Sequence, residues 1–491
     1  MQLIPRFALL SLLTASPTAV LAQVVPDGAL RPEAERPLPR PDYAVPATPP
    51  PALPSAPAAP QAMTGGASVT LTAIVVEGDR AKAPVRAWEP LVDPASGLKV
   101  TLEPDELLGP EWVQRQFADN GLVGTPVPYA RIVGFIQLIN ARFAKEGYIN
   151  SGLLVPPQDP VNGSGPLTLR LVLGRVPPEA LVVAEPSGGL SVQFVQARLP
   201  SAYRYPFNAA AFERDFRLLA EDPAVATVNA DLRPTGRAGE AALAVSVTPA
   251  DRFDLYASIA NSRTPSIGPE RLAIGASFRN ALTAGDQIAA EIGTTEGVTD
   301  FAGTYALPVF GPRTRFFATA GINDALVIDA VLAPLDIRTE SVLIGAGLAH
   351  DFVKTPLMPK PGGGFAAART LSAKAQFDYR NTKTFLLGEP FSFAPGSVRG
   401  LSRYYAARAG LDYVSRSVSE VLASALTVTV GLDGTRSDIP GVPAPDKHFV
   451  GVLGQATYAR RLNDAGTEVR ARASAQWHSS VAYAGERMPI G

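Results

Sequence analysis

The stretch 468–478, EVRARASAQWH, alternates between two kinds of side chain from end to end. Its odd-numbered residues, from Val469 to Trp477, are apolar, and its even-numbered residues, from Glu468 to His478, are charged or polar. A period of two is the pattern of a β-strand with two unlike faces. Strands of soluble sandwiches commonly have about 5–6 residues, whereas a tilted strand that crosses a bilayer needs about 9–11. The stretch therefore predicts a membrane-crossing strand with one face toward lipid and the other toward water.

The same alternation recurs throughout the chain after residue 250, for example in FDLYASI at 253–259 and LSAKAQFDY at 371–379. We predict about eleven strands of this kind, near residues 252–262, 269–280, 285–297, 298–310, 314–327, 340–353, 368–384, 402–417, 420–434, 448–463 and 466–479. Links after even-numbered strands are mostly short, and links after odd-numbered strands include the long segments 385–401 and 435–447. Alternating short turns and long loops are typical of outer-membrane barrels, and only the link near 354–367 breaks the pattern.

The N-terminal part has the composition of an exported protein. Residues 1–22 resemble a secretory signal peptide, with Arg6, an apolar core at Phe7–Leu13 and a small-residue cleavage site that ends at Ala22. Residues 23–67 are rich in Pro and Ala and predict an extended linker. The chain has no Cys, three His and a net charge of −1. These counts argue against a zinc or iron–sulfur cofactor and against a nucleic-acid partner, and we expect no cofactor.

Two small α/β units are predicted between the linker and the alternating region. In the first unit, residues 68–176, apolar residues recur at helical spacing between Pro128 and Tyr148. We predict a strand before this helix and two strands after it. The second unit, residues 177–250, repeats the plan with a helix that begins after Asn208, a plausible N-cap. The remainder, residues 251–491, is the barrel region.

Several short motifs, taken in order, resemble one protein family. They are DGALR at 27–31, FAKEGYI at 143–149, LVPPQ at 154–158, ADLRP at 230–234, and the segments 261–268 and 279–286. The chain resembles the outer-membrane transporters of two-partner secretion, the haemolysin secretion/activation family. Those proteins have a signal peptide, a Pro-rich region, two POTRA domains and a sixteen-stranded barrel. The resemblance implies an α+β periplasmic POTRA region followed by an antiparallel transmembrane β-barrel, of which about eleven strands are present.

The family has a Val/Ile-Arg-Gly-Tyr/Phe tetrad in the loop between its eleventh and twelfth strands. This chain has Val398, Arg399 and Gly400 followed by Leu401, in the link between the seventh and eighth predicted strands. The tetrad and an ordinary loop arginine are both open readings of this segment. The sequence at 486–491, ERMPIG, resembles the stretch just before the tetrad. On that alignment the sequence stops before strands twelve to sixteen, and we expect a C-terminal truncation.

The resemblance also implies a function and a set of partners. The full protein would carry a haemolysin-, adhesin- or filamentous-haemagglutinin-like exoprotein from the periplasm to the cell surface of a Gram-negative bacterium, by type V secretion. The POTRA domains would bind this client by adding a strand to an exposed sheet edge or by seating it in a helix groove. Outer-membrane lipid, lipopolysaccharide and the barrel-assembly machinery are further expected partners. Candidate residues facing the pore are Arg271, Arg279, Lys374, Asp378, Arg470 and Arg472.

Other readings remain open. Each of these charged residues has the alternative role of keeping a pore hydrated without touching the client. An assembly factor for outer-membrane proteins has the same architecture, although such factors usually carry more or differently arranged POTRA domains. A passive porin needs no periplasmic modules. A periplasmic enzyme is the different-class alternative, but the sequence has no GxSxG motif and too few His for a metal cluster, so we expect no catalytic activity.

Overall fold

The computed structural model describes residues 43–44, 68–82, 88–103, 106–159, 161–261, 263–360, 363–463 and 466–486. The chain forms two compact units, one of residues 46–250 and the other of residues 1–45 together with 251–491. The signal peptide predicted at 1–22 and nearly all of the linker predicted at 23–67 lie outside the described residues.

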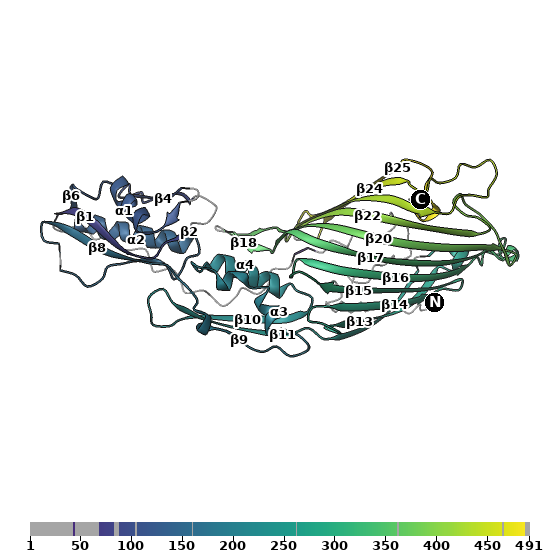
Figure 1. Ribbon diagram of the computed structural model, residues 1–491, viewed down its shortest axis with the longest axis horizontal. Coiled ribbons are helices and arrows are strands. Elements are labelled where there is room, and N and C mark those ends of the chain that lie inside the picture. The colour runs from purple at the N-terminus through teal and green to yellow at the C-terminus, as the bar shows by residue number, and fades with distance from the viewer. Residues whose placement is uncertain are drawn as a thin grey trace, which may run out of the picture. The chain divides into compact units, whose positions relative to one another are not determined.

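The first lobe of the smaller unit is a four-stranded sheet with two helices (Figure 1). The strand order is β6-β1-β8-β7, and β1 and β8 are parallel. The strands are β1 (Ser68–Gly78), β6 (Pro126–Pro128), β7 (Gly152–Leu154) and β8 (Ser164–Val172), and the helices are α1 (Pro110–Asp119) and α2 (Tyr129–Lys145). Between β1 and α1 lie two small antiparallel pairs: β2 (Ala81–Lys82) with β5 (Leu107–Leu108), and β3 (Trp88–Val92) with β4 (Lys99–Leu102).

The predicted helix of this lobe is confirmed as α2. Its stripe of Ile132, Phe135, Ile136, Ile139 and Phe143 is buried. The chain leaves the helix at Gly147, whose positive φ of 87° suits a residue without a side chain. Packing of α2 against the sheet therefore provides part of the apolar core of the lobe, to which α1 also contributes.

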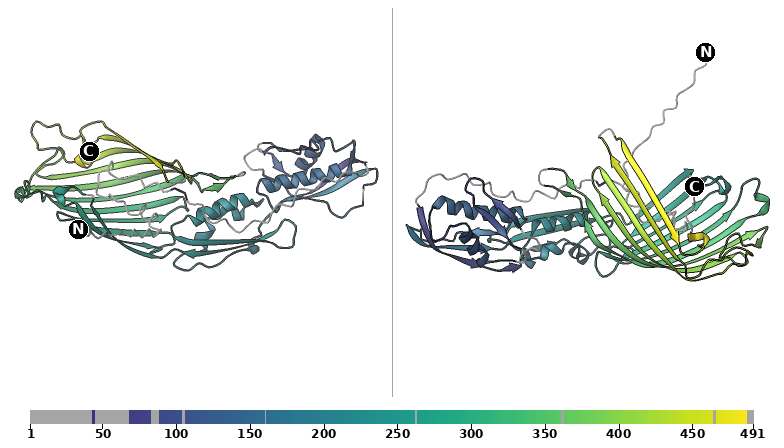
Figure 2. Two further views of the ribbon diagram at one scale, coloured as in Figure 1. Left: turned by 180° about the vertical axis from the view of Figure 1, so that it is seen from behind. Right: turned by 90° about the horizontal axis from the view of Figure 1, so that it is seen from above.

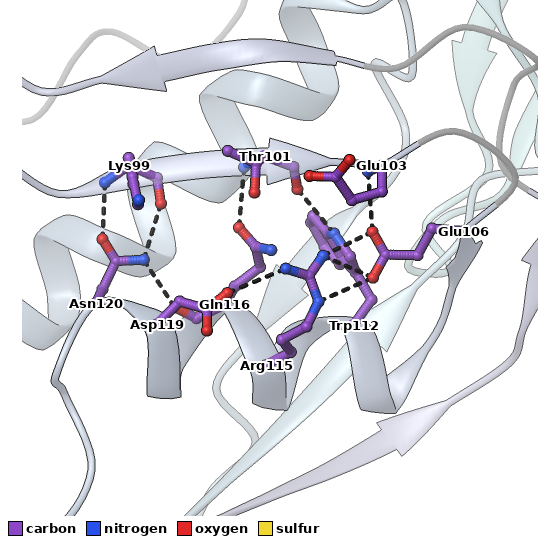
Figure 3. A network of polar contacts seen from close by, with 9 residues as sticks. All are labelled: Lys99, Thr101, Glu103, Glu106, Trp112, Arg115, Gln116, Asp119 and Asn120. Carbon is purple, nitrogen blue, oxygen red and sulfur yellow. Dashed lines mark hydrogen bonds and ion pairs between the residues drawn. The ribbon is translucent and has the colours of Figure 1, made fainter.

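Helix α1 was missed by the sequence reading, which gave this unit a single helix. Pro110 stands at its first turn, a position that Pro favours. Figure 3 shows how its polar side chains bind the backbone of β4. The Trp112 indole N–H donates to the Thr101 carbonyl at 3.0 Å, and the Gln116 carbonyl oxygen accepts from the Thr101 N–H at 2.9 Å. Asn120 pairs with both backbone groups of Lys99 at 2.8 Å. These contacts lie far apart in sequence, so local periodicity could not indicate them.

The second lobe repeats the plan on a smaller scale. Its sheet has the order β10-β11-β9, built from β9 (Leu181–Val183), β10 (Val225–Pro234) and β11 (Ala241–Pro249). Its helices are α3 (Val192–Gln196) and α4 (Ala209–Ala220), with the short 3₁₀ turns η4 (Pro178–Ala180) and η5 (Pro200–Tyr203). The predicted cap is confirmed, because the Asn208 side chain accepts from the Ala211 N–H at 2.9 Å.

The larger unit is built around a large antiparallel sheet, which curves in the views of Figure 2. Its eleven long strands confirm the predicted strands one for one: β12 (Phe253–Asn261), β13 (Glu270–Arg279), β14 (Gln287–Thr294), β15 (Val298–Pro308), β16 (Thr314–Leu326), β17 (Arg338–Thr355), β20 (Ala368–Leu386), β22 (Leu401–Arg416), β23 (Glu420–Gly434), β24 (Val450–Arg461) and β25 (Glu468–His478). Each strand pairs with its neighbours in sequence, as expected for a meander. A twelfth strand, the two-residue β21 (Glu389–Pro390), pairs with the end of β20.

The links of this sheet carry small ordered elements. The irregular link near 354–367 contains a hairpin of β18 (Met358–Pro359) and β19 (Phe365–Ala366), which explains why it broke the predicted alternation of loop lengths. The 3₁₀ turns are η6 (Pro265–Ile267), η7 (Ala333–Leu335) and η8 (Ala484–Glu486). The domain boundaries predicted at 176/177 and 250/251 stay predictions.

Candidate functional site

The register of the large sheet sorts its side chains onto two faces. Residues directly opposite each other on paired strands point to the same side of a sheet. Following the pairs from β13 to β22 gives one row: Ser277, Ala289, Thr304, Thr319, Gly345, Asp378 and Ala406. Every residue of this row is small or polar. We call this side of the sheet the polar face.

The opposite side carries large apolar side chains, and we call it the apolar face. Ile274, Ile292, Phe301 and Ile322 stand in one row on four adjacent strands. Their exposed fractions lie between 40% and 54%. A contiguous apolar surface of this kind is unfavourable in water, and outer-membrane barrels present such a surface to lipid.

The first charge cluster on the polar face is centred on Arg271 of β13. Its guanidinium lies 2.5 Å from a carboxylate oxygen of Asp300 on β15 and 2.8 Å from one of Glu291 on β14. Arg263 binds the same Asp300 at 3.0 Å, and the Tyr256 hydroxyl donates to Glu291 at 2.6 Å. Two positive and two negative side chains therefore balance within the cluster.

The second charge cluster is centred on Arg408 of β22, which is almost completely buried. Its guanidinium lies 2.5 Å from Asp378 on β20 and 2.6 Å from Glu486 in η8. The Tyr404 hydroxyl donates to Glu486 at 2.7 Å, and Arg380 donates to the Gly485 carbonyl at 3.2 Å. This cluster also contains two arginines and two carboxylates. The cluster joins strands β20 and β22 to the 3₁₀ turn η8, which lies outside the strands and folds back onto the sheet.

All six residues predicted to face the pore occur on the polar face by register, but in different surroundings. Arg271 and Asp378 belong to the two clusters, and Arg279 is buried beside Asp254. Lys374 is partly buried and lies 3.7 Å from Asp412. The two residues on strand β25 are exposed: Arg470, which pairs with Glu468, and Arg472. Their facing a pore, and their contact with a client, stay predictions.

The tetrad candidate forms a tight turn between β21 and β22. The backbone N–H groups of Val398 and Leu401 each donate to the other's carbonyl, at 2.9 and 3.0 Å. Arg399 and Gly400 both have positive φ, as in a type I′ hairpin turn. The exposed Arg399 donates its backbone N–H to Asp438 in the long link after β23. The turn geometry accounts for Gly400, and a motif role for the segment stays a prediction.

Several cluster members were not among the predicted residues. Arg408 stands on the same face of its strand as Tyr404 and Asp412, because all three are even-numbered. The period of two in 402–417 was therefore the available signal for Arg408. Asp300 likewise occupies a polar position of its strand. Glu486 lies outside a strand, and its contacts cross 78 residues of sequence to Arg408. No local pattern could have found it.

The two lobes of the smaller unit contact each other through polar groups. Arg175 pairs with Glu240 at 2.5 Å, and the Asn208 side chain donates to the Glu146 carbonyl at 2.8 Å. The Tyr205 hydroxyl donates to Asp79 at 3.1 Å. Burial and the neighbouring carboxylate of Asp79 raise the pKa of the Tyr205 phenol to about 12.

The second lobe presents an open strand edge. Strand β10 stands at the end of its sheet, so within the described part of the chain only β11 pairs with it. An unpaired edge exposes backbone donors and acceptors that another extended segment can bind.

Two further searches of the described residues were negative. No helix there is both long and apolar enough to cross a membrane. No cluster of three or more His, Cys, Asp or Glu side chains there has the geometry to hold a metal ion.

Some known proteins are similar to this chain in sequence or in fold. No family model matches the chain. The heme/hemopexin transporter protein HuxB of Haemophilus influenzae is 26% identical over 268 residues, which is 53% of this chain. The chain spans under half of the length of that relative, 43%. CdiB from Escherichia coli has a similar structure, with a TM-score of 0.55 at 18% identity over 89% of this chain and 73% of CdiB.

The chain is similar to the two-partner secretion transporters in sequence and in fold. The similarity in sequence rests on the match to HuxB, and the similarity in fold rests on the match to CdiB. The fold is that of two α/β POTRA domains, which are the lobes of the smaller unit, followed by the antiparallel sheet of a β-barrel. In an outer-membrane barrel, the apolar face of such a sheet is turned to lipid and the polar face to the interior.

Proposed function

We propose that the full protein translocates a partner exoprotein from the periplasm to the cell surface by two-partner, type V secretion. The sequence match to a transporter over 268 residues carries this proposal. The two-faced sheet supports it, because a hydrated inner face is what an extended polypeptide needs to cross the membrane. We also propose that the role is transport rather than catalysis.

The polar face would provide the path of the client. In both charge clusters the positive and negative side chains balance, so neither holds an unpaired charge ready to bind a client tightly. A transport path works only if its contacts are weak enough to be released. Four further charged residues of the polar face would keep this path hydrated: Arg279, Lys374, Arg470 and Arg472. Direct contact between these residues and the client is the alternative role.

The POTRA lobes would receive the client before it enters the path. The open edge of β10 offers a place where an extended segment could add as a further strand. The matched relative, HuxB, is described as a heme/hemopexin transporter protein. For this chain we propose only the general class of haemolysin-, adhesin- or haemagglutinin-like exoproteins. Lipid and lipopolysaccharide would surround the apolar face, and the barrel-assembly machinery would insert it.

A secretion assay tests the proposal. The full-length gene is deleted from its host and restored on a plasmid, and the large exoproteins in the culture medium and on the cell surface are quantified. The proposal predicts that one exoprotein disappears from both fractions and returns on complementation, while the levels of other outer-membrane proteins stay constant. A general loss of outer-membrane proteins would instead favour the assembly-factor alternative. Unchanged secretion of every exoprotein would refute the proposal.

A further inference from the structure

Two basic side chains, Lys383 near the end of β20 and Arg403 near the start of β22, stand on the apolar face beside the long link between these strands, and we call them the basic pair. We propose that the basic pair binds the phosphate groups of lipopolysaccharide, the phosphorylated glycolipid of the outer leaflet. This rests on the proposed function in one respect, because that function places the long links of the sheet at the cell surface.

The register brings the basic pair together on one side of the sheet. Lys383 pairs with Leu401, and Arg403 pairs with Asn381, so the two basic residues are diagonal neighbours on adjacent strands. Diagonal neighbours on a sheet lie about 7–8 Å apart and share a face. Residues two apart along a strand also share a face, so Lys383 lies on the side of the exposed Phe377. One headgroup can therefore reach both cations.

The side chains along this face follow the order of the parts of a membrane lipid. Phe377 and Leu411 are apolar and about half exposed, as residues in contact with acyl chains would be. Next come Tyr379 and Tyr405, which pair across the two strands with ring centroids 5.0 Å apart. Aromatic girdles mark the interfaces of outer-membrane barrels. With a rise of about 3.3 Å per residue, the basic pair begins about 7 Å beyond the tyrosines, at the level of the headgroups.

Both members of the basic pair are exposed and have no side-chain partner in the part of the chain that the structure describes. This distinguishes them from the arginines of the polar face that are bound to carboxylates, such as Arg271 and Arg408. Two unbound cations on one side of two adjacent strands leave room for an external anion.

The carboxylates around the basic pair already have other partners. Glu340 stands opposite the lysine of the pair, but Arg338 binds it at 3.3 Å and also binds Asp324 at 2.7 Å. Asp433, opposite a tyrosine of the girdle, lies 3.6 Å from Lys447. Three basic and two acidic side chains therefore share this part of the apolar face, which leaves it net positive and complementary to phosphate.

The combination of features favours a phosphorylated lipid over a soluble anion. Arginine offers a planar fork of donors that fits phosphate oxygens, and lysine adds a mobile point charge. Basic residues beside a membrane surface attract anionic headgroups in this way. A soluble anion would need only the cations, whereas a lipid also uses the tyrosines and the continuous apolar face next to them. Lipopolysaccharide is the lipid that presents phosphates at this surface.

Titration with lipid A, the phosphorylated anchor of lipopolysaccharide, tests the proposal without any client. The full-length protein in a zwitterionic detergent is titrated with fluorescent lipid A that carries both phosphates, and fluorescence anisotropy gives the Kd. Dephosphorylated lipid A and phosphatidylglycerol are titrated in the same way. We expect the doubly phosphorylated form to bind at least about tenfold more tightly than either, because only it offers two phosphates to the two cations.

Matched double variants locate the site. Lys383→Gln with Arg403→Gln should weaken binding of phosphorylated lipid A about tenfold and leave binding of the dephosphorylated form unchanged. Arg369→Gln with Arg460→Gln removes two charges from exposed positions at the opposite end of the apolar face, on the separate strands β20 and β24, and should leave both affinities unchanged. Lys383→Arg with Arg403→Lys keeps both charges and should retain binding. The heat-modifiable band on a gel, which reports the folded barrel, should persist in every variant.

Three kinds of result would overturn the proposal. Equal affinity of the parent for phosphorylated and dephosphorylated lipid A would mean that the phosphates are not recognised, and this comparison needs no variant. An affinity that survives loss of the basic pair, or falls equally in the control, would place binding elsewhere. Phosphatidylglycerol binding as tightly as lipid A would assign the surface to phospholipid. Since no client is present, a failed secretion assay leaves the titration standing, and a failed titration leaves the proposed secretion function untouched.

Discussion

The large sheet and the first POTRA lobe use the same side chains in opposite places. The lobe buries large apolar side chains such as Phe117, Phe135 and Phe143 between its helices and sheet. The large sheet buries charged side chains such as Arg408 on one face and exposes aliphatic ones such as Ile259, at 83%, on the other. Both follow the rule that apolar groups leave water. In the proposed outer-membrane barrel, the difference lies in what surrounds each region, which is water for the lobe and lipid for the apolar face.

This contrast means that burial has to be interpreted differently in the two units. In the lobe, a buried apolar residue contributes stability in proportion to the area it removes from water. In the proposed barrel, an exposed apolar residue of the sheet already has an apolar neighbour in lipid, and buried charged residues such as Arg408 are held by ion pairs. Matched substitutions in the two regions should therefore have unequal effects.

The largest effect is expected from Phe135→Ala in the lobe, compared with Phe377→Ala on the apolar face. Phe135 is completely buried, so its truncation should cost about 3–5 kcal/mol of unfolding free energy. Phe377 is 48% exposed, and its truncation leaves no closed cavity in the protein. Urea unfolding of the detergent-purified chain, followed by Trp fluorescence in a Trp477→Phe background, reports on Trp88 and Trp112 of the lobe. Equal losses of lobe stability from both variants would contradict the comparison.

The next largest effect on folding is expected from an arginine placed at one of two adjacent positions of β23, which face opposite sides of the sheet. Leu426 is on the apolar face, and Ala425 pairs with Asp412 across the polar face. Arginine on the lipid side of a barrel costs about 2–4 kcal/mol near the bilayer midplane. Leu426→Arg should therefore lower the folded, heat-modifiable fraction in membranes, whereas Ala425→Arg should retain it. If Ala425→Arg proves the more damaging, the assignment of the two faces is wrong.

Arginines on the same face should also differ by their burial. Arg271→Met leaves Glu291 and Asp300 with fewer donors, at a cost of about 1–3 kcal/mol. The cost is limited because Tyr256 and Arg263 still bind these carboxylates. Arg470→Met breaks an exposed pair that water screens, so its effect on stability should be smaller. Urea titration of the barrel in vesicles, followed by the heat-modifiable band, measures both. Similar midpoints for the two variants would show that burial on the polar face is unimportant.

The sequence predicted the sheet better than it predicted the clusters. The period of two located all eleven long strands, because each strand has unlike surroundings on its two faces and records that difference locally. It also located Arg271 and Asp378. The partners of these residues come from other strands, or in the case of Glu486 from a segment without periodicity, so the pairings needed the register. Helix α1 is a different case, because Trp112, Val113 and Phe117 recur at helical spacing after Pro110, so a local signal was present and was missed.

The smallest effect concerns the polar contact between the two lobes and its dependence on pH. The pKa of the Tyr205 phenol rises from 10.0 to about 12 on folding, because of burial and Asp79. Below pH 10 the phenol keeps its proton in both states, so its contribution to stability is complete. That contribution is lost as the pH rises from the unfolded pKa of about 10 toward the folded pKa of about 12. Because Tyr205 is 45% exposed, the solvent weakens the effect.

Urea unfolding of the smaller unit at pH 9 and pH 11 measures this contact. The parent should lose more stability between the two pH values than Tyr205→Phe, which has no phenol to ionise. Tyr129→Phe, at an exposed position of α2, serves as the matched control and should behave like the parent. An equal loss in the parent and in Tyr205→Phe would mean that the hydrogen bond to Asp79 does not persist in solution. The two lobes would then be joined by Arg175–Glu240 and the backbone contacts of Asn208 alone among the polar contacts described above.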